Sequence, residues 1–174
     1  MMPCQPFSRL FFALRPPPAA AEHIGRSWPW LAPAGRRVAA GRLHVTLNLV
    51  GDWPLLPPDL VEALAPVGDA VRAAPFRVVF DRLCGNGEVA LIRPSEAVPA
   101  LDALQRRLAA ALARAGLGRR RGARFSPHVT LAYRAGRSLD EWTEPVSWEV
   151  RDFVLIESRI PLARHVLRGR WRLR

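Results

Sequence analysis

The sequence contains no lysine and almost no cysteine. All 26 basic residues among the 174 are arginine, which excludes a lysine Schiff base, a phosphate-binding P-loop lysine and a ligase that adenylylates lysine. Two cysteines, Cys4 and Cys84, are too few and too far apart for a disulfide framework or a cysteine-based zinc site. This cysteine usage fits a reducing compartment, and we predict a cytoplasmic protein.

Long hydrophobic runs are also lacking. No stretch approaches the ~20 apolar residues of a membrane helix, and the apolar run at 10–14 is shorter than the core of a signal peptide. We therefore expect no membrane association. The hydrophobic content of 49% is enough to bury the core of one domain. We predict that residues 1–174 form a single domain and a monomer.

Charge of one sign is in excess. The net charge is +11, which favours an acidic partner such as a phosphate polymer. Codon bias would explain arginine in place of lysine but not this excess. Arginines cluster at 119–124 and alternate with Leu167, Gly169, Trp171 and Leu173 in the tail, so an extended tail would present Arg168, Arg170, Arg172 and Arg174 on one face. They are either ordinary solvated surface or guides for RNA.

Short apolar runs alternate with helical patterns along the whole chain. The apolar runs predict strands at 9–14, 43–50, 76–83, 88–92, 124–133, 153–160 and from 167 onward. Helices are predicted at 19–30, at 59–73 with a kink or an early end at Pro66, and at 98–115. This order indicates an α+β fold with largely antiparallel sheets.

One tetrapeptide occurs twice. His-Val-Thr-Leu occupies residues 44–47 and recurs at 128–131, in a chain with four histidines and three threonines. A shuffled sequence would place two of three threonines two residues after a histidine roughly once in several hundred attempts. A lone histidine on a half-buried strand is usually structural, and threonine is a common strand former. The repetition favours function for both pairs.

The repeated residues suit phosphodiester chemistry. Side chains alternate along a strand, so His44 and Thr46 share one face, as do His128 and Thr130. A histidine pKa near 6.5 lets one ring accept a proton while the other donates one near neutral pH. Threonine hydroxyls can hold the phosphate oxygens. Ser126 has no G-x-S-x-G context, and the scattered histidines lack an acidic cluster, so a serine hydrolase and a zinc enzyme are disfavoured.

These motifs resemble those of a known family. The paired HVTL segments, RLFFAL near the N-terminus, LQRRLAAAL, FSPHVTLAYR and LIESRI look like the 2′-5′ RNA ligase family, also called RNA 2′,3′-cyclic phosphodiesterases, of the two-histidine (2H) phosphoesterase superfamily. The resemblance implies a bilobal α+β fold, with two antiparallel sheets related by pseudo-twofold symmetry around a central cleft and helices outside. It also implies metal-independent and ATP-independent hydrolysis of 2′,3′-cyclic phosphate RNA ends to 2′-phosphomonoesters, without a cofactor.

The resemblance also assigns roles. His44 would be the general acid for the departing ribose 3′ oxygen, His128 the general base for water, and Thr46 and Thr130 the phosphate ligands. Some members have an arginine five residues after the second histidine. Here Tyr133 holds that position and the arginine follows as Arg134, which we include as a phosphate-binding candidate.

Alternatives to this function remain open at this point. The expected partner is RNA with 2′,3′-cyclic phosphate ends, such as tRNA halves, which the family joins reversibly through 2′-5′ linkages. Other 2H phosphodiesterases trim RNA 3′ ends or hydrolyse 2′-5′ oligoadenylate or cyclic nucleotides. A non-catalytic RNA-binding module would explain the charge but would need no matched His and Thr pairs.

Overall fold

The computed structural model describes residues 5–31, 36–117 and 125–174. The arginine cluster at 119–124 and Cys4 lie outside these residues. Within the described ranges no helix is long and apolar enough to cross a membrane. The elements, in chain order, are β1 (Phe7–Leu14), α1 (Pro18–Arg26), β2 (Arg36–Arg37), the 3-10 helix η1 (Ala40–Arg42), β3 (Val45–Trp53), α2 (Leu60–Asp69), β4 (Phe76–Asn86), β5 (Val89–Arg93), α3 (Pro99–Arg114), β6 (Val129–Tyr133), β7 (Ser138–Val150), β8 (Asp152–Ile160) and β9 (Arg164–Arg172).

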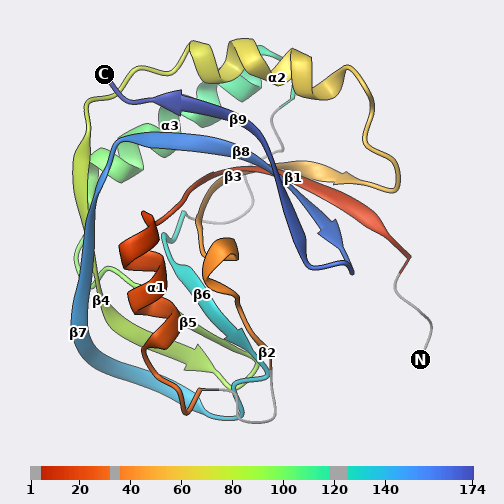
Figure 1. The fold of residues 1–174 in the computed structure, drawn as a ribbon. Helices are drawn as coiled ribbons and strands as arrows, with labels where there is room; N and C mark the ends of the chain where they lie inside the picture. Colours follow the sequence, from red (N-terminus) through yellow and green to blue (C-terminus); the bar gives the residue numbers. More distant parts are fainter. Residues whose placement is uncertain (1–4, 32–35, 118–124) are drawn as a thin grey trace.

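The described strands form one antiparallel sheet with two matching halves. Its order is β7-β4-β5-β6-β3-β1-β8-β9, with β2 paired to β6 (Figure 1). The strands of the two HVTL segments, β3 and β6, are the innermost strand of each half. They meet at one residue pair, Val45 and Val129. The predicted α+β class is confirmed, and the two predicted sheets are joined through this single pair into one.

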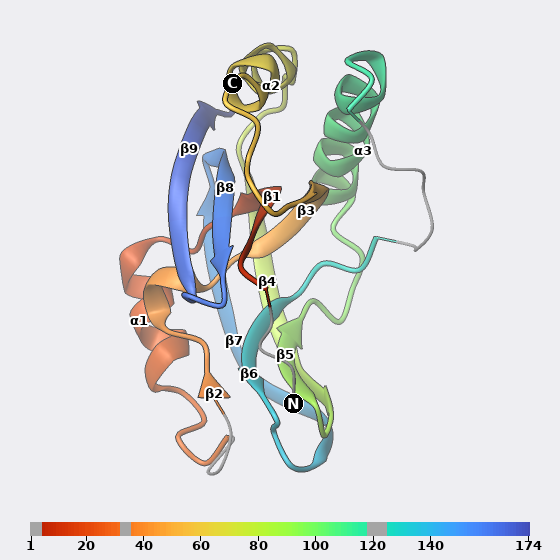
Figure 2. The same cartoon turned by 90° about the vertical axis from the view of Figure 1, so that its right-hand side faces the viewer.

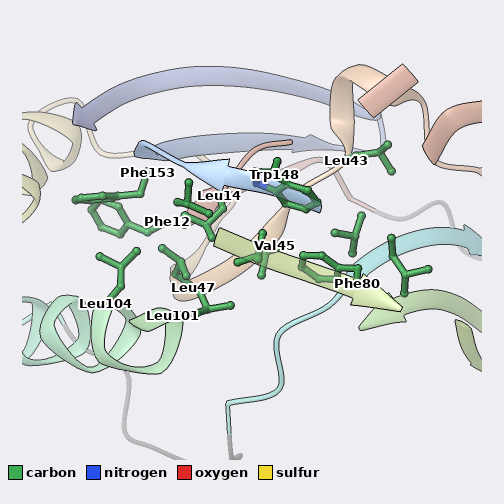
Figure 3. Packing of buried hydrophobic residues seen from close by; sticks show 14 of the residues in the cluster. Phe12, Leu14, Leu43, Val45, Leu47, Phe80, Leu101, Leu104, Trp148 and Phe153 are labelled. Carbon is green, nitrogen blue, oxygen red and sulfur yellow. The ribbon is translucent and has the colours of Figure 1, made fainter. Parts of the chain in front are cut away.

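The three α-helices of the described residues bury the core against this sheet. In Figure 2, α2 and α3 lie beside the half that contains β8 and β9, and α1 lies beside the other half. Apolar residues of α3 recur at helical spacing and are buried: Leu101, Leu104, Leu108, Ala111 and Leu112. Burying each leucine stabilises the fold by ~1.5–3 kcal/mol. Figure 3 shows Leu101 and Leu104 packed beneath Phe12, Leu47 and Phe153 of the sheet.

The second predicted helix ends earlier than its apolar pattern. It was expected over 59–73, and α2 ends at Asp69 with Pro66 inside it. Asp69 then accepts a hydrogen bond from Trp171 Nε1 at 2.9 Å, and the Trp171 ring stacks on Phe153. This contact ties α2 to the last strand.

The tail departs from strict alternation. The β8–β9 pairing shifts register between Leu155 and Ile156, so Leu155 faces Gly169 while Ile156 faces Leu167. Arg168 is the extra residue of this bulge, and its side chain binds Glu157. Leu167 is 47% exposed. The predicted apolar face is therefore wrong at Leu167, and the predicted arginine face is wrong at Arg168.

Candidate functional site

The fold brings the two HVTL segments together. His44 and His128 immediately precede β3 and β6, and the next residues, Val45 and Val129, form the pair that joins the two halves. Two segments 84 residues apart in the sequence thus lie side by side at the centre of the sheet.

The two segments present the same face to the outside. Val45, Leu47, Val129 and Leu131 are at most 4% exposed and belong to the core. Thr46 is exposed, and the histidines and Thr130 are half-buried. The predicted alternation, with the apolar pair inward and the polar pair outward, is confirmed in both strands. Both histidines and both threonines therefore belong to the face of the sheet opposite the helices.

Each histidine is held by the same local hydrogen bond. His44 Nδ1 lies 2.7 Å from the carbonyl oxygen of Arg42, and His128 Nδ1 lies 2.8 Å from that of Ser126. A carbonyl only accepts, so Nδ1 carries the hydrogen in both rings. Nε2 of each ring is left for proton transfer. The two sites thus also share the position of this carbonyl, two residues before each histidine, although the residues that supply it differ.

The surroundings of His44 disfavour its charged form. Burial lowers its pKa, the hydrogen bond to the Arg42 carbonyl raises it, and the positive charges of Arg42, His128 and Arg15 lower it, so that the pKa is below its usual value. Arg15 donates to the Gly41 carbonyl at 2.6 Å, and Nε of Arg42 is buried without a hydrogen-bond partner. This local positive field favours an anion beside His44.

A third histidine contacts His44. The His165 ring, on β9, lies edge-on to His44 with ring centroids 5.2 Å apart. Phe11 packs against both rings, at 4.9 Å from His44 and 5.8 Å from His165. Burial, followed by the charges of His44, Arg42 and Arg15, lowers the pKa of His165 to about 4. Near neutral pH, His165 is therefore an uncharged ring that packs against His44.

His165 is not among the candidate site residues predicted from the sequence. No local signal marks it, because it approaches His44 only through the pairing of β9 with β8 and of β8 with β1. His23 lies on α1 and is exposed.

A bulge in β6 changes the direction in which the residues after His128 face. Thr130 pairs with Leu91, but Ala132 pairs with Ala90, so Leu131 is an extra residue. Leu131 and Ala132 are both buried, and Tyr133 emerges 44% exposed on the face of Thr130. The position five residues after His128 is thus on the histidine face.

Arg134 lies beyond the end of β6. It has a left-handed backbone (φ 54°), and its N–H donates to the Glu88 carbonyl at 2.6 Å. Its side chain is exposed. On β1, Arg9 forms an ion pair with Asp52 of β3, with Nε and Oδ1 2.8 Å apart.

The arrangement offers two imidazole Nε2 atoms, two hydroxyls and a positive field on one face of the sheet. This set suits proton transfer to and from a phosphate ester, with hydroxyl donors for the phosphate oxygens. Within the part of the chain that the structure describes, no group of three or more His, Cys, Asp or Glu residues is placed to hold a metal ion.

Comparisons with known proteins agree with this geometry. The structure of Escherichia coli LigT complexed with 3′-AMP is similar with a TM-score of 0.81 and 27% identity, covering 96% of this chain and 98% of that one. A structure described as a phosphoesterase has a TM-score of 0.79 and 27% identity, covering 95% and 98%. The fold is shared with TT0787 of Thermus thermophilus at a TM-score of 0.77 and 24% identity, covering 95% and 98%.

No curated protein sequence matches the chain. The family model of the 2′-5′ RNA ligase superfamily matches residues 16–159. Because this match covers well over half of the chain, the protein belongs to the 2′-5′ RNA ligase superfamily.

Proposed function

We propose that this protein is an RNA 2′,3′-cyclic phosphodiesterase that yields 2′-phosphomonoesters. The observation that carries the proposal is the pair of matched His and Thr residues on one face, each histidine held through Nδ1 by the carbonyl two residues upstream. Membership of the superfamily and the likeness to E. coli LigT, whose structures are complexed with 3′-AMP, ATP and NADP+, support a nucleotide substrate.

The reaction needs two proton transfers, one from the attacking water and one to the departing O3′. Water attacks the phosphorus and loses a proton to Nε2 of His128, while the bond from phosphorus to O3′ breaks and O3′ takes a proton from Nε2 of His44. The products are a 2′-phosphomonoester and a free 3′-hydroxyl. The hydroxyls of Thr46 and Thr130 donate to the non-bridging oxygens, where negative charge grows in the transition state. Proton exchange with solvent then restores both rings.

Protonation of His44 is coupled to substrate binding in this scheme. Burial and the neighbouring positive charges lower the pKa of His44 in the free protein, so the ring is largely neutral above that pKa. A bound phosphodiester brings a negative charge, which favours the imidazolium form. The substrate therefore helps to charge its own general acid.

The direct test is hydrolysis of a short RNA with a 2′,3′-cyclic phosphate end in the presence of EDTA. We expect a 2′-phosphate, identified by mapping the phosphate position in the product. His44→Ala and His128→Ala are each expected to reduce the rate by about 10²- to 10⁴-fold. His23→Ala is the matched control, since it removes an exposed histidine outside the site.

Each outcome separates one alternative. A 3′-phosphate product, or turnover only of 2′-5′ oligoadenylate or of a cyclic nucleotide, would favour another 2H phosphodiesterase. Salt-dependent RNA binding that persists in both alanine variants, with no turnover by the wild type, would favour a non-catalytic RNA-binding module. Full activity in either alanine variant would refute the assignment of acid and base.

A further inference from the structure

The face that holds His128 continues across three further strands. Ile92 of β5 pairs with Val129 of β6, and the two strands are antiparallel. The next residue of β5, Arg93, is therefore opposite the residue before Val129, His128, and the two share one face. Arg93 is in turn paired with Arg82 of β4.

The next strand extends the same row. Arg82 is paired with Trp142 of β7. The buried neighbours Ile92, Leu83 and Val129 point to the core, which confirms that the row Arg93, Arg82, Trp142 faces away from it. Two arginines and a tryptophan thus run outward from His128. We call these three residues the outer row.

Trp142 is the unusual member of the outer row. Its side chain is 70% exposed, although tryptophan is normally well buried, and it belongs to neither hydrophobic core cluster of the described residues. The Arg82 guanidinium lies 4.8 Å from the centre of its ring and also pairs with Asp140. The guanidinium therefore fixes the orientation of the indole ring without covering most of it.

The other end of the outer row is positively charged and close to the reaction centre. Arg93 is exposed, and its Nε donates to Cys84 Sγ at 3.2 Å. Adjacent strands lie about 4.8 Å apart, so Trp142 is about 14 Å from His128 across the sheet. At the ~3.4 Å spacing of stacked nucleotides this distance corresponds to about four nucleotides, and to fewer in a stretched chain.

We propose that the outer row binds single-stranded RNA on the 5′ side of the cyclic phosphate end, with Trp142 stacking on a base and the arginines contacting phosphates. Exposed aromatic rings beside arginines bind single strands without base preference, because every base has a stacking face. The net charge of +11 and the continuity of the outer row with His128 favour RNA as the occupant. This inference rests on the proposed function.

The test compares substrates of different length. For the wild type, kcat/KM for a cyclic-phosphate tetranucleotide is expected to exceed that for the cyclic mononucleotide by roughly 5- to 140-fold, the range that stacking of one base supplies. Trp142→Ala should lower this ratio at least fivefold, since it removes the stacked base but keeps the arginine contacts. Arg93→Gln should reduce the slope of log K against log salt for RNA binding by about 0.7, the loss of one contact to a single strand.

The chain contains a matched control. Trp30 is 43% exposed, and the Arg137 guanidinium lies 4.5 Å from the centre of its ring. Arg137 forms an ion pair with Glu141. Glu141 is opposite the buried Leu83 of β4 in the sheet, not opposite Arg82, so this second Trp–Arg pair lies outside the outer row. Trp30→Ala should keep the length ratio of the wild type, and circular dichroism of both tryptophan variants would verify folding.

The outcomes distinguish this inference from the proposed function. The outer row is overturned as an RNA site if the wild type turns over the tetranucleotide and the mononucleotide with equal kcat/KM. It is also overturned if Trp30→Ala and Trp142→Ala have the same ratio of the two kcat/KM values. Either result leaves the proposed phosphodiesterase activity intact. If neither substrate turns over, the proposed function fails. Fluorescence anisotropy with a labelled RNA tetranucleotide then decides the inference by itself: equal affinity of the wild type and Trp142→Ala would overturn it.

Discussion

Replacing Glu157 should remove a pH-dependent part of the stability. Glu157 lies on β8 and is 3% exposed. Its carboxylate accepts hydrogen bonds from Ser8 Oγ of β1 at 2.7 Å, from Arg159 Nε at 3.0 Å and from Arg168 Nε of β9 at 2.9 Å. One side chain thus joins three strands, including those that carry Phe11 and His165.

The size of the effect follows from the pKa. Burial alone raises the pKa of Glu157, but the hydrogen bonds from Ser8, Arg159 and Arg168 outweigh burial and lower the pKa from 4.5 to about 2. A shift of this size corresponds to about 3 kcal/mol of folding free energy, at ~1.4 kcal/mol per unit. Because the pKa is lowered, this stability is fully present above pH 4.5 and is lost as the pH falls through 2.

The assay is urea unfolding followed by tryptophan fluorescence at pH 7, 5 and 3, at constant ionic strength. Glu157→Gln should lower the free energy of unfolding by about 3 kcal/mol at pH 7, and the gap to the wild type should narrow at pH 3. Glu141→Gln removes a partner of an exposed pair and should cost less than about 1 kcal/mol. A gap for Glu157→Gln that stays constant from pH 7 to pH 3 would refute the reasoning.

Three further predictions concern the site and its support. Thr46→Val and Thr130→Val keep the shape of the strand but lose a hydroxyl, so each should lower kcat by about 10- to 1000-fold, measured on the cyclic-phosphate RNA; an unchanged kcat would exclude a role in charge stabilisation. The fall in rate at high pH that reports deprotonation of His44 should occur at a higher pH in the kcat profile than in the kcat/KM profile, because bound phosphate favours the charged form of the ring. If both profiles fall at the same pH, protonation of His44 is not coupled to substrate binding. Gly68→Ala should destabilise the fold by ~1–3 kcal/mol in urea unfolding, because the new Cβ would come within 2.1 Å of the Trp171 ring; stability equal to the wild type would show that the ring moves aside.

Local patterns in the sequence were sufficient for much of the fold. The apolar spacing in 98–115 identified α3, and the apolar runs at 76–83 and 88–92 identified β4 and β5, which pair as neighbours. The repeated tetrapeptide identified the two strands that meet at the centre of the sheet. In each case the signal lies within a few residues of the element, where backbone propensity and side-chain alternation act directly.

Features that depend on long-range pairing were missed. The strand β7 was not predicted, because Ser138–Val150 includes Glu144 and Pro145 and lacks a regular apolar alternation. Among the described strands β7 lies at the edge of the sheet and pairs only with β4, so it tolerates both residues. Bulges in β6 and β9 changed which face Tyr133 and Arg168 occupy. A bulge follows from the pairing of two strands, so neither sequence segment alone reveals it.

The single pair that joins the halves of the sheet determines how far each residue would move if the halves rotated about it. If the halves rotated by about 10° around Val45 and Val129, a residue one step along the strand, ~3.4 Å away, would move about 0.6 Å, while Trp142, about 14 Å away, would move about 2.5 Å. His44 and His128 are the residues one step away. Such a rotation would therefore leave the spacing between His44 and His128 almost unchanged. It would mainly shift the outer row, which we propose as the surface for a longer RNA.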